Sequence, residues 1–321
     1  MISIEVSSLK KYYGEIKAVD GISFTVNEGE VFGLLGPNGA GKTTAIEIME
    51  GLRERDAGDV KVLGLDPWKN GYELHKKIGV IPQQFTFFEK QNPREAIKYY
   101  ADLFSVKVDP DEILREVLLE DSAKNLFENL SGGQRQKMGL ALSLVNSPEL
   151  FFLDEPTTGL DPNARRAIWE VILGLKAKGK TIILTTHYLE EAQHLSDRVA
   201  IMDHGQIVAM GTSDEIIEQH GSGEKLEIHG SEKLAEYIRA NTELKVDYDK
   251  GLIRIPLKEK IDALAALAAA EQSGMDWGEI QTRRDSLDDV FIKLVSGVID
   301  ENGNIAVTKW ENKANSQRRR K

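Results

Sequence analysis

The sequence predicts an α/β protein with a largely parallel sheet, followed by a smaller α+β unit. Three observations support this fold class. Apolar, strand-like runs alternate with helical patterns up to about residue 220. A glycine-rich segment at residues 36–44 joins one of these strands to a helical pattern. After a Gly-Ser-Gly segment at residues 221–223, the order of strands and helices changes. Regular alternation is typical of a parallel sheet with helices packed on its faces.

The first part of the chain is expected to contain strands and helices in alternation. Strands are predicted at residues 30–35, 61–64, 78–82, 149–154, 181–186 and 198–205. Helices are predicted at residues 42–50, 94–104, 133–146, 162–178 and 188–195. The runs at 149–154 and 181–186 lack polar alternation, which is typical of central strands that are covered on both faces.

The second part has the order strand, helix, strand, strand, helix, strand over residues 225–283, which is the order of a ferredoxin-like sandwich. Lys250 and Gly251 are expected to form the tight turn between the two middle strands. A last helix is predicted at residues 286–295, with Ser286 as a candidate N-cap. We therefore expect three parts: a main domain at 1–220, a small α+β domain at 224–297 and a polar tail at 298–321.

Composition excludes several classes of function. The 321 residues suggest two domains at about 150 residues each. With 41 Lys and Arg against 52 Asp and Glu, the net charge is −11, so the chain as a whole does not match nucleic acid. No apolar run approaches the ~18 residues of a membrane-spanning helix, and the start lacks the apolar region of a secretory signal. The absence of cysteine excludes disulfides and thiolate chemistry and fits a cytosolic protein.

Residues 36–44 read GPNGAGKTT and satisfy the phosphate-binding pattern G-x-x-x-x-G-K-[ST]. Glycine lets backbone N–H groups turn toward a phosphate, and a helix that begins near Gly41 directs unsatisfied N–H groups at the anion. Lys42 adds a positive charge for the β- and γ-phosphates, and the Thr43 hydroxyl suits Mg²⁺, which prefers oxygen ligands. The predicted nucleotide-binding residues are Gly36, Pro37, Asn38, Gly39, Ala40, Gly41, Lys42, Thr43 and Thr44.

A glycine-rich turn without a ligand is the alternative interpretation of this segment. The strand before it and the helical pattern after it favour the phosphate site. Kinases, GTPases and motor ATPases share the pattern, so on its own it indicates nucleotide binding and nothing narrower.

The apolar run LFFLDEP at residues 150–156 ends in two acids. Asp154 stands at the carboxyl end of a parallel strand, where such sheets place ligands, and its carboxylate is a candidate for holding Mg²⁺. Glu155 is the candidate general base, able to orient and deprotonate a water against the γ-phosphorus. The alternative is that both acids begin a turn fixed by Pro156. Their place after a phosphate loop favours the functional interpretation.

The segment LSGGQ at residues 130–134 narrows the class of protein. Ser131, Gly132 and Gly133 present backbone N–H groups at the start of a helix, which makes a second anion site. With this segment between the phosphate loop and the acidic strand, the sequence resembles the ATP-binding subunits of ABC transporters over residues 2 to about 220. The resemblance implies a P-loop NTPase fold of the ABC type, with ATP as substrate and Mg²⁺ as cofactor.

The resemblance also assigns single residues. Tyr13 matches the aromatic residue that stacks on adenine, with Tyr12 as a rival. Gln83 matches the glutamine that touches Mg²⁺ or the attacking water, with Gln84 as an alternative one residue away. Asp161 matches the aspartate of the family's D-loop.

His187 matches the switch histidine that contacts the γ-phosphate. Its alternative is a strand-end histidine bonded to the backbone. His187, His194 and His204 lack the spacing of a compact zinc site. The implied catalytic residues are Lys42, Gln83, Glu155 and His187, and the implied magnesium ligands are Thr43, Gln83 and Asp154.

In the family, the segment Ser131, Gly132, Gly133 and Gln134 of one subunit faces the ATP held by another. Two ATP molecules are then buried between two domains. The resemblance therefore implies that the partner is a second copy of this chain or a homologous ATPase subunit, and that hydrolysis opens the dimer.

The segment SLDDVFIKLVSG from residue 286 resembles the closing motif of the drug-resistance and drug-export type of subunit. Those subunits work with an integral membrane permease in a separate chain. The resemblance thus implies an exporter subunit that is cytoplasmic and peripheral on the inner face of the cell membrane. The alternative is a capped amphipathic helix that only seals the small domain.

Two other functions stay open at this point. One is a soluble ABC-type ATPase that acts on ribosomes or DNA, which the acidic balance and the single cassette disfavour. The other is a regulatory ATP sensor without transport. The basic cluster Arg318–Lys321 is either a contact for anionic lipid or the end of a solvated tail.

Overall fold

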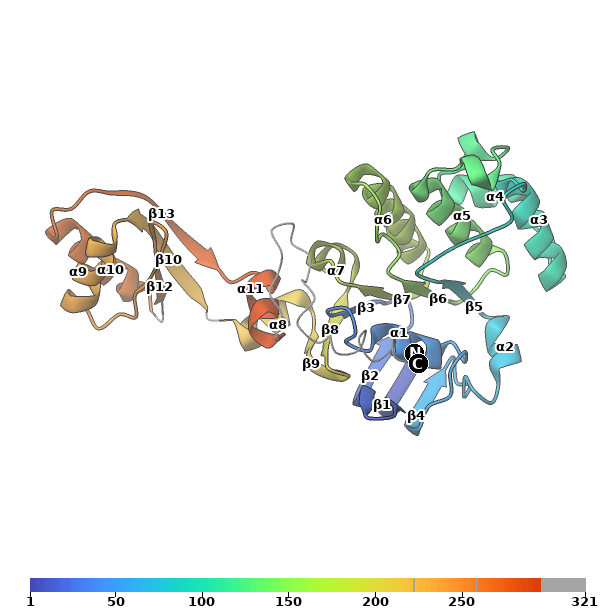
Figure 1. Cartoon of the computed structure of the whole chain (residues 1–321), viewed down its shortest axis with the longest axis horizontal. Helices are drawn as coiled ribbons and strands as arrows, with labels where there is room; N and C mark the ends of the chain where they lie inside the picture. The colour runs from blue at the N-terminus through green and yellow to red at the C-terminus, as the bar shows by residue number, and fades with distance from the viewer. Residues whose placement is uncertain (222, 258, 296–321) are drawn as a thin grey trace, which may run out of the picture. The chain divides into compact units, whose positions relative to one another are not determined.

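The structure, a computed structural model, describes residues 1–221, 223–257 and 259–295 (Figure 1). The predicted tail, its basic cluster and Ser222 of the predicted linker lie outside the described residues. The described chain forms two compact units, namely Met1–Thr212 with Leu294 and Val295, and Ser213–Lys293. The second unit begins with helix α8 (Ser213–His220), one element before the predicted boundary, and the domain limits stay a prediction.

A six-stranded sheet forms the centre of the first unit, in the order β5-β6-β7-β3-β8-β9. Its strands are β3 (Val31–Leu35), β5 (Ile78–Ile81), β6 (Leu150–Asp154), β7 (Thr181–Thr186), β8 (Arg198–Asp203) and β9 (Gln206–Gly211). All neighbours are parallel except β8 and β9, which confirms the predicted, largely parallel sheet. Every residue of β6 and β7 is buried, as predicted for central strands.

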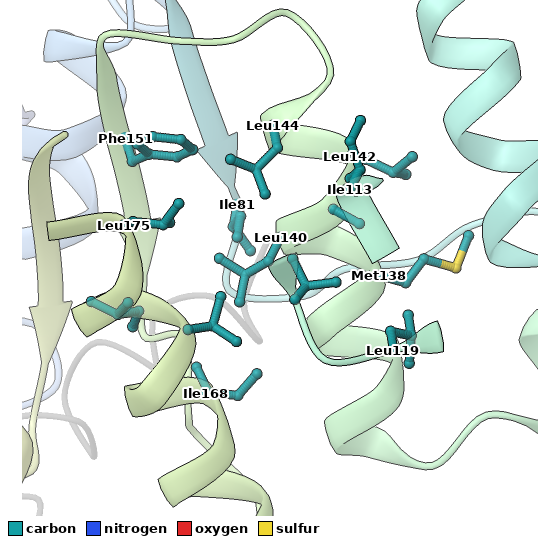
Figure 2. Packing of buried hydrophobic residues seen from close by; sticks show 14 of the residues in the cluster. Ile81, Ile113, Leu119, Met138, Leu140, Leu142, Leu144, Phe151, Ile168 and Leu175 are labelled. Carbon is teal, nitrogen blue, oxygen red and sulfur yellow. The ribbon is translucent and has the colours of Figure 1, made fainter. Parts of the chain in front are cut away.

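Helices α5 (Gly132–Leu144) and α6 (Pro162–Ala177) cover one face of this sheet, and α3 (Pro93–Phe104) and α4 (Pro110–Glu116) pack against α5 (Figure 1). Figure 2 shows Leu140 and Ile168 of these helices in the same apolar cluster as Phe151 of β6. Because successive strand residues alternate between faces, Phe152 belongs to a second cluster on the other side of the sheet.

The opposite face is covered by helix α1 (Lys42–Met49) and an antiparallel sheet of order β2-β1-β4. Its strands are β1 (Ile2–Tyr13), β2 (Ile16–Asn27) and β4 (Ala57–Val62). The interpretation of residues 61–64 as a strand of the parallel sheet was wrong, because β4 begins earlier and pairs antiparallel with β1. Strands β1 and β2 were not predicted, since exposed polar residues alternate with the buried apolar ones.

The five predicted helices of the first unit are present with nearly the predicted limits. Their caps explain the agreement: Asn92 accepts a hydrogen bond from Glu95 N before α3, and Pro93 takes the first helical position. Helices α2 (Gly71–His75) and α4 were not predicted, and α7 (Leu189–Leu195) starts one residue later than expected. No described helix combines the length and apolar character that a bilayer span requires.

The second unit contains the predicted order of elements in a four-stranded antiparallel sheet, β11-β12-β10-β13. The elements are β10 (Glu224–Gly230), α9 (Glu232–Asn241), β11 (Asp247–Asp249), β12 (Leu252–Leu257), α10 (Lys260–Gln272) and β13 (Trp277–Arg284). Alternate residues of β10 and β12, such as Leu226 and Ile253, form a core with the two helices. Lys250 and Gly251 have φ of 44° and 90°, which is the left-handed pair that a tight hairpin turn requires.

Helix α11 (Leu287–Leu294) follows β13 and begins as predicted. Ser286 Oγ accepts a hydrogen bond from Asp289 N at 3.3 Å, and Ser286 N donates to the Asp289 carboxylate at 2.9 Å. This reciprocal cap fixes the start of the helix. Val290 and Phe291 are fully buried, so the predicted apolar face is present.

Replacing Phe152 by alanine should lower the free energy of unfolding by about 3–5 kcal/mol, because the fully buried ring leaves a cavity in the centre of the sheet. Urea unfolding followed by circular dichroism measures this loss. The matched control is Leu103→Ala at a side chain that is 65% exposed, which should change stability by no more than about 0.5 kcal/mol. Equal effects of the two changes would contradict the described core.

Candidate nucleotide-binding site

The glycine-rich loop between β3 and α1 is held tightly by neighbouring backbone. Gly36 N donates to Thr186 O at 3.3 Å, and a Cβ on Gly36 would lie 2.4 Å from Met202 O. Gly41 has φ of 104°, and a Cβ there would lie 2.0 Å from Ala18 O. Glycine is therefore required at both positions by close approach, and at Gly41 by backbone conformation as well.

The Lys42 side chain lies inside this loop and is only 5% exposed. Its Nζ donates to Gly36 O at 2.8 Å and to Pro37 O at 3.1 Å, and lies 3.6 Å from Glu155 Oε1. Burial lowers the pKa of Lys42, and the two neighbouring acids act against this. The first N–H groups of α1 have no acceptor within the helix. A buried cation beside such N–H groups is suited to binding an anion.

Asp154 ends β6 beside the start of α1. Thr43 Oγ1 donates to Asp154 Oδ1 at 3.4 Å, and the Thr185 hydroxyl donates to the same oxygen. Burial raises the pKa of Asp154, while these two hydroxyls lower it. A threonine hydroxyl and a carboxylate oxygen side by side are the ligand types that Mg²⁺ prefers, so the donors present fit this ion.

Glu155 has a left-handed backbone conformation, with φ of 49°. The amide is fixed there because Glu155 N donates to Thr185 Oγ1 at 2.9 Å. Oxygen Oε2 accepts from Gln83 Nε2 at 3.0 Å and from Thr158 Oγ1 at 3.1 Å. Such a conformation costs energy in a residue with a side chain, and strain of this kind concentrates at functional sites.

His187 Nδ1 lies 3.3 Å from Glu155 Oε2, in a geometry that does not form a hydrogen bond. Burial alone would raise the pKa of Glu155, but His187, the Lys42 ammonium and the Thr158 hydroxyl outweigh burial and lower it to about 2. Glu155 is therefore ionised at neutral pH. A carboxylate with so low a pKa orients a water well and accepts a proton weakly.

The segment 131–134 forms the tip of α5. Gln134 N donates to Ser131 Oγ at 3.3 Å, and Ser131 N donates to Gln134 Oε1 at 2.9 Å, which completes a capping box. A Cβ on Gly133 would lie 2.8 Å from Ala164 Cβ, so α5 approaches α6 closely. Among the described residues, no hydrogen bond or ion pair joins this tip to the loop 36–44 of the same chain.

The structure thus brings six predicted residues together: Lys42, Thr43, Gln83, Asp154, Glu155 and His187. Gln84 forms no hydrogen bond or ion pair within the described residues, which favours Gln83. Tyr13 ends β1 with 40% exposure, and its ring lies 5.4 Å from Arg53 Cζ. Tyr12 instead donates its hydroxyl to Asp20 and is thereby held in place.

Asp161 caps α6 and accepts hydrogen bonds from Asn163 N and Ala164 N, both at 3.0 Å. Its contacts in this chain are therefore those of a helix cap, and they fix the direction in which α6 leaves the acidic strand.

Sequence reasoning missed the hydroxyls that hold the two acids, Thr158 and Thr185. The signal for Thr185 was a threonine pair at the end of an otherwise apolar strand. A further missed residue is Glu191 of α7, which is 1% exposed and accepts from Thr157 Oγ1 at 2.8 Å and Trp169 Nε1 at 3.1 Å. It joins the turn after β6 to α6.

Comparison with known proteins assigns the family. The sequence profile described as ABC transporter matches residues 19–158. The daunorubicin resistance ATP-binding protein DrrA3 of Streptomyces coeruleorubidus is 35% identical over 302 residues, which cover 91% of this chain and 95% of that protein. The chain belongs to the ATP-binding subunits of ABC transporters.

A second relative and a solved structure agree with this assignment to the ABC ATP-binding subunits. The Nod factor export ATP-binding protein I of Rhizobium sp. (strain N33) is 41% identical over 234 residues, covering 71% of this chain and 77% of that protein. The solved ATP-binding cassette MJ0796, a dimer in a post-hydrolysis state with ADP and Pi, is 25% identical with a TM-score of 0.57. That similarity covers 65% of this chain and 98% of the solved one, and the P-loop NTPase fold is thereby confirmed for the first unit.

Glu50, the C-cap residue that follows α1, is 4% exposed. Burial raises its pKa from 4.5 to about 8, and the charges of Asp154 and Glu47 add to this. Since the folded state holds the proton more tightly than the unfolded state, Glu50 contributes stability that is fully present below pH 4.5 and lost as the pH rises through 8.

Glu50→Gln should therefore raise the free energy of unfolding by about 5 kcal/mol at pH 9 and change it little near pH 4.5. Urea unfolding of the nucleotide-free chain with a chelator, at both pH values, measures the difference. The control is Glu54→Gln at an exposed side chain, which should show no such pH dependence. Parallel pH profiles of wild type and Glu50→Gln would contradict the buried, protonated acid.

Proposed function

We propose that this chain is the ATP-hydrolysing subunit of an ABC exporter, dimerises around MgATP and drives a separate membrane permease. The observation that carries the proposal is the group formed by Lys42, Thr43, Asp154 and Glu155 at the ends of adjacent elements. The names of the relatives, which are resistance and export proteins, support transport over a role on ribosomes or DNA.

The phosphates of ATP would bind next to the Lys42 ammonium. Lys42 Nζ donates to two loop carbonyls and faces Glu155, so a polyphosphate would compete with these weaker partners for the same ammonium. The N–H groups at the start of α1 add donors to the phosphate oxygens. Thr43 and Asp154 would hold Mg²⁺, which when bound neutralises phosphate charge.

Glu155 would orient the attacking water. Gln83 and Thr158 hold oxygen Oε2, and Oε1 faces Lys42. When Lys42 turns to a phosphate, Glu155 loses the charge that helps to lower its pKa, and the carboxylate becomes a better proton acceptor. Nucleotide binding and activation of the base are thus coupled through one lysine. His187, which lies beside Glu155, is placed to donate to a phosphate oxygen.

A second subunit would complete the site. The capped tip at residues 131–134 offers N–H groups at a helix start and has no described contact with the phosphate loop of its own chain. The dimeric state of the solved cassette MJ0796 supports a pair of cassettes in which this tip meets the nucleotide of the other subunit.

A membrane permease is the proposed second partner, which places the chain on the inner face of the cell membrane. The segment after Gln83 leads to an apolar surface in which Phe88 is 59%, Tyr99 47% and Leu103 65% exposed. The rings of Phe88 and Tyr99 pack edge to face with centroids 6.3 Å apart. Exposed aromatic groups of this kind mark protein interfaces, and Gln83 connects this surface to Glu155.

Lys42→Ala should weaken ATP binding by about 10- to 100-fold, because a charge-assisted contact to the phosphates is lost. Isothermal titration calorimetry with ATP and Mg²⁺ measures the affinity. The control, Lys61→Ala, removes an exposed lysine that pairs with Glu5 and should bind ATP as wild type does. Unchanged affinity in Lys42→Ala would exclude the assigned phosphate site.

Glu155→Gln should bind ATP and hydrolyse it at least about 100-fold more slowly, since the amide cannot accept a proton. Phosphate release measures turnover, and light scattering should detect a dimer that accumulates with ATP. Glu149→Gln, at an exposed acid just before the same strand, is the control and should hydrolyse normally. Wild-type turnover in Glu155→Gln would refute the assignment of the base.

A further inference from the structure

Strand β13 forms one edge of the sheet in the second unit (Figure 1). It pairs with β10 on one side, and no other described strand pairs with it on the outer side. Seven of its eight residues are exposed. An open edge of this length presents a row of unpaired N–H and C=O groups, which is a template for another strand.

The opposite edge of the sheet differs. Strand β11 has only three residues, Asp247–Asp249, and two of them are acids. Short, charged edges are the usual protection against pairing. Strand β13 is less protected. Its register shift lies near its start, opposite His229, and the longer stretch from Ile280 to Arg284 pairs regularly with β10.

The charges on β13 are arranged so that the strand complements itself. Gln281 lies opposite Glu227 of β10 and Arg283 opposite Lys225, so both side chains lie on the sheet face away from the helices. Glu279 precedes them by two and four residues. In a two-fold symmetric antiparallel pair of identical strands, one residue faces its own copy, and the axis passes midway between these two residues.

We propose that β13 pairs antiparallel with β13 of a second copy of this chain, with the two-fold axis at Gln281. Glu279 then faces the partner's Arg283, and the same pair forms again on the other side of the axis. Ile280 faces the partner's Thr282. Opposite charges in directly opposed positions stabilise a pair of strands, and the guanidinium has five donors, so Arg283 can keep its own contact with Asp289 at 3.1 Å.

Other positions of the axis do not match the charges. An axis at Glu279 or at Arg283 would place that residue against its own copy, which opposes like charges. An axis at Thr282 would place Glu279 against the partner's Asp285. An axis at Ile280 would place Glu279 against the partner's Gln281, so that neither Glu279 nor Arg283 would face an opposite charge. Only the axis at Gln281 pairs the two glutamates with the two arginines.

This contact is distinct from the dimer around ATP, since it involves the second unit and requires no nucleotide. It specifies an identical partner, whereas the nucleotide site alone accepts a second copy or a homologous subunit. Its failure would leave the proposed ATP hydrolysis intact, because β13 contributes no residue to the nucleotide-binding site.

Disulfide trapping tests the position of the axis, because the wild-type chain contains no cysteine. In full-length, nucleotide-free Gln281→Cys, the two thiols face each other at a Cα separation of about 5 Å, within disulfide reach. Mild oxidation should convert more than about half of the chain to a reducible dimer. The control is Arg284→Cys, at an exposed position outside the proposed charge pairs, whose two copies lie about 20 Å apart and should cross-link little. Equal trapping in both variants would overturn the proposal.

Charge exchange tests the pairing of Glu279 with Arg283. Glu279→Arg and Arg283→Glu should each weaken the nucleotide-free dimer by at least about tenfold in sedimentation equilibrium, and the double exchange should restore it. Failure of the double exchange to restore the dimer would overturn the proposal. So would a full-length chain that is monomeric while a chain ending at residue 297 dimerises, since the tail would then cover β13. ATP hydrolysis, measured in every variant, should stay at the wild-type rate.

Discussion

The contact between Lys42 and Glu155 is the constraint on which the nucleotide site depends. Both side chains are almost completely buried, and each would be costly to leave without an opposite charge. The surroundings satisfy them fully: the loop carbonyls of Gly36 and Pro37 accept from the lysine, and Gln83 and Thr158 donate to the glutamate. The glycine loop, the left-handed turn after β6 and the end of β7 are all arranged around this pair. A nucleotide whose phosphates bind Lys42 would therefore change the charge balance around Glu155 and its hydrogen-bond partners as well.

Acids with very different proton affinities lie within one domain. Glu50 has a pKa raised to about 8, Asp154 a raised pKa, and Glu155 a pKa lowered to about 2. All three are buried, so burial alone does not explain the spread. Glu155 has a lysine and a histidine beside it, whereas Glu50 is surrounded by the negative charges of Asp154 and Glu47. Positive neighbours keep Glu155 ionised, whereas negative neighbours and burial keep Glu50 protonated at neutral pH.

The chemistry-bearing residues could be predicted from the sequence because each follows a local pattern: a glycine loop before a helix, two acids after an apolar strand, a capped helix tip. Helix ends were predictable for the same reason, since caps such as Asn92 lie within three residues of what they bind. The partners of Thr185 and Glu50 could not be predicted from the sequence. Thr185 meets Asp154 because β7 pairs with β6, and Glu50 senses the charge of Asp154 because α1 packs near the end of β6. No local sequence pattern specifies either arrangement. The antiparallel sheet of β1, β2 and β4 was missed because its strands expose one polar face and resemble loop sequence.

The buried carboxylate of Glu191 has an optical consequence. It accepts the indole N–H of Trp169, which is 5% exposed and whose ring lies 4.9 Å from the imidazole of His194. Helix α6 starts just after its N-cap Asp161 and α7 starts just after Tyr188, and this indole lies where the two helices meet. A dry indole emits fluorescence at shorter wavelength than a hydrated one. The emission of Trp169 thus reports any movement between α6 and α7, once it is separated from that of the other three tryptophans.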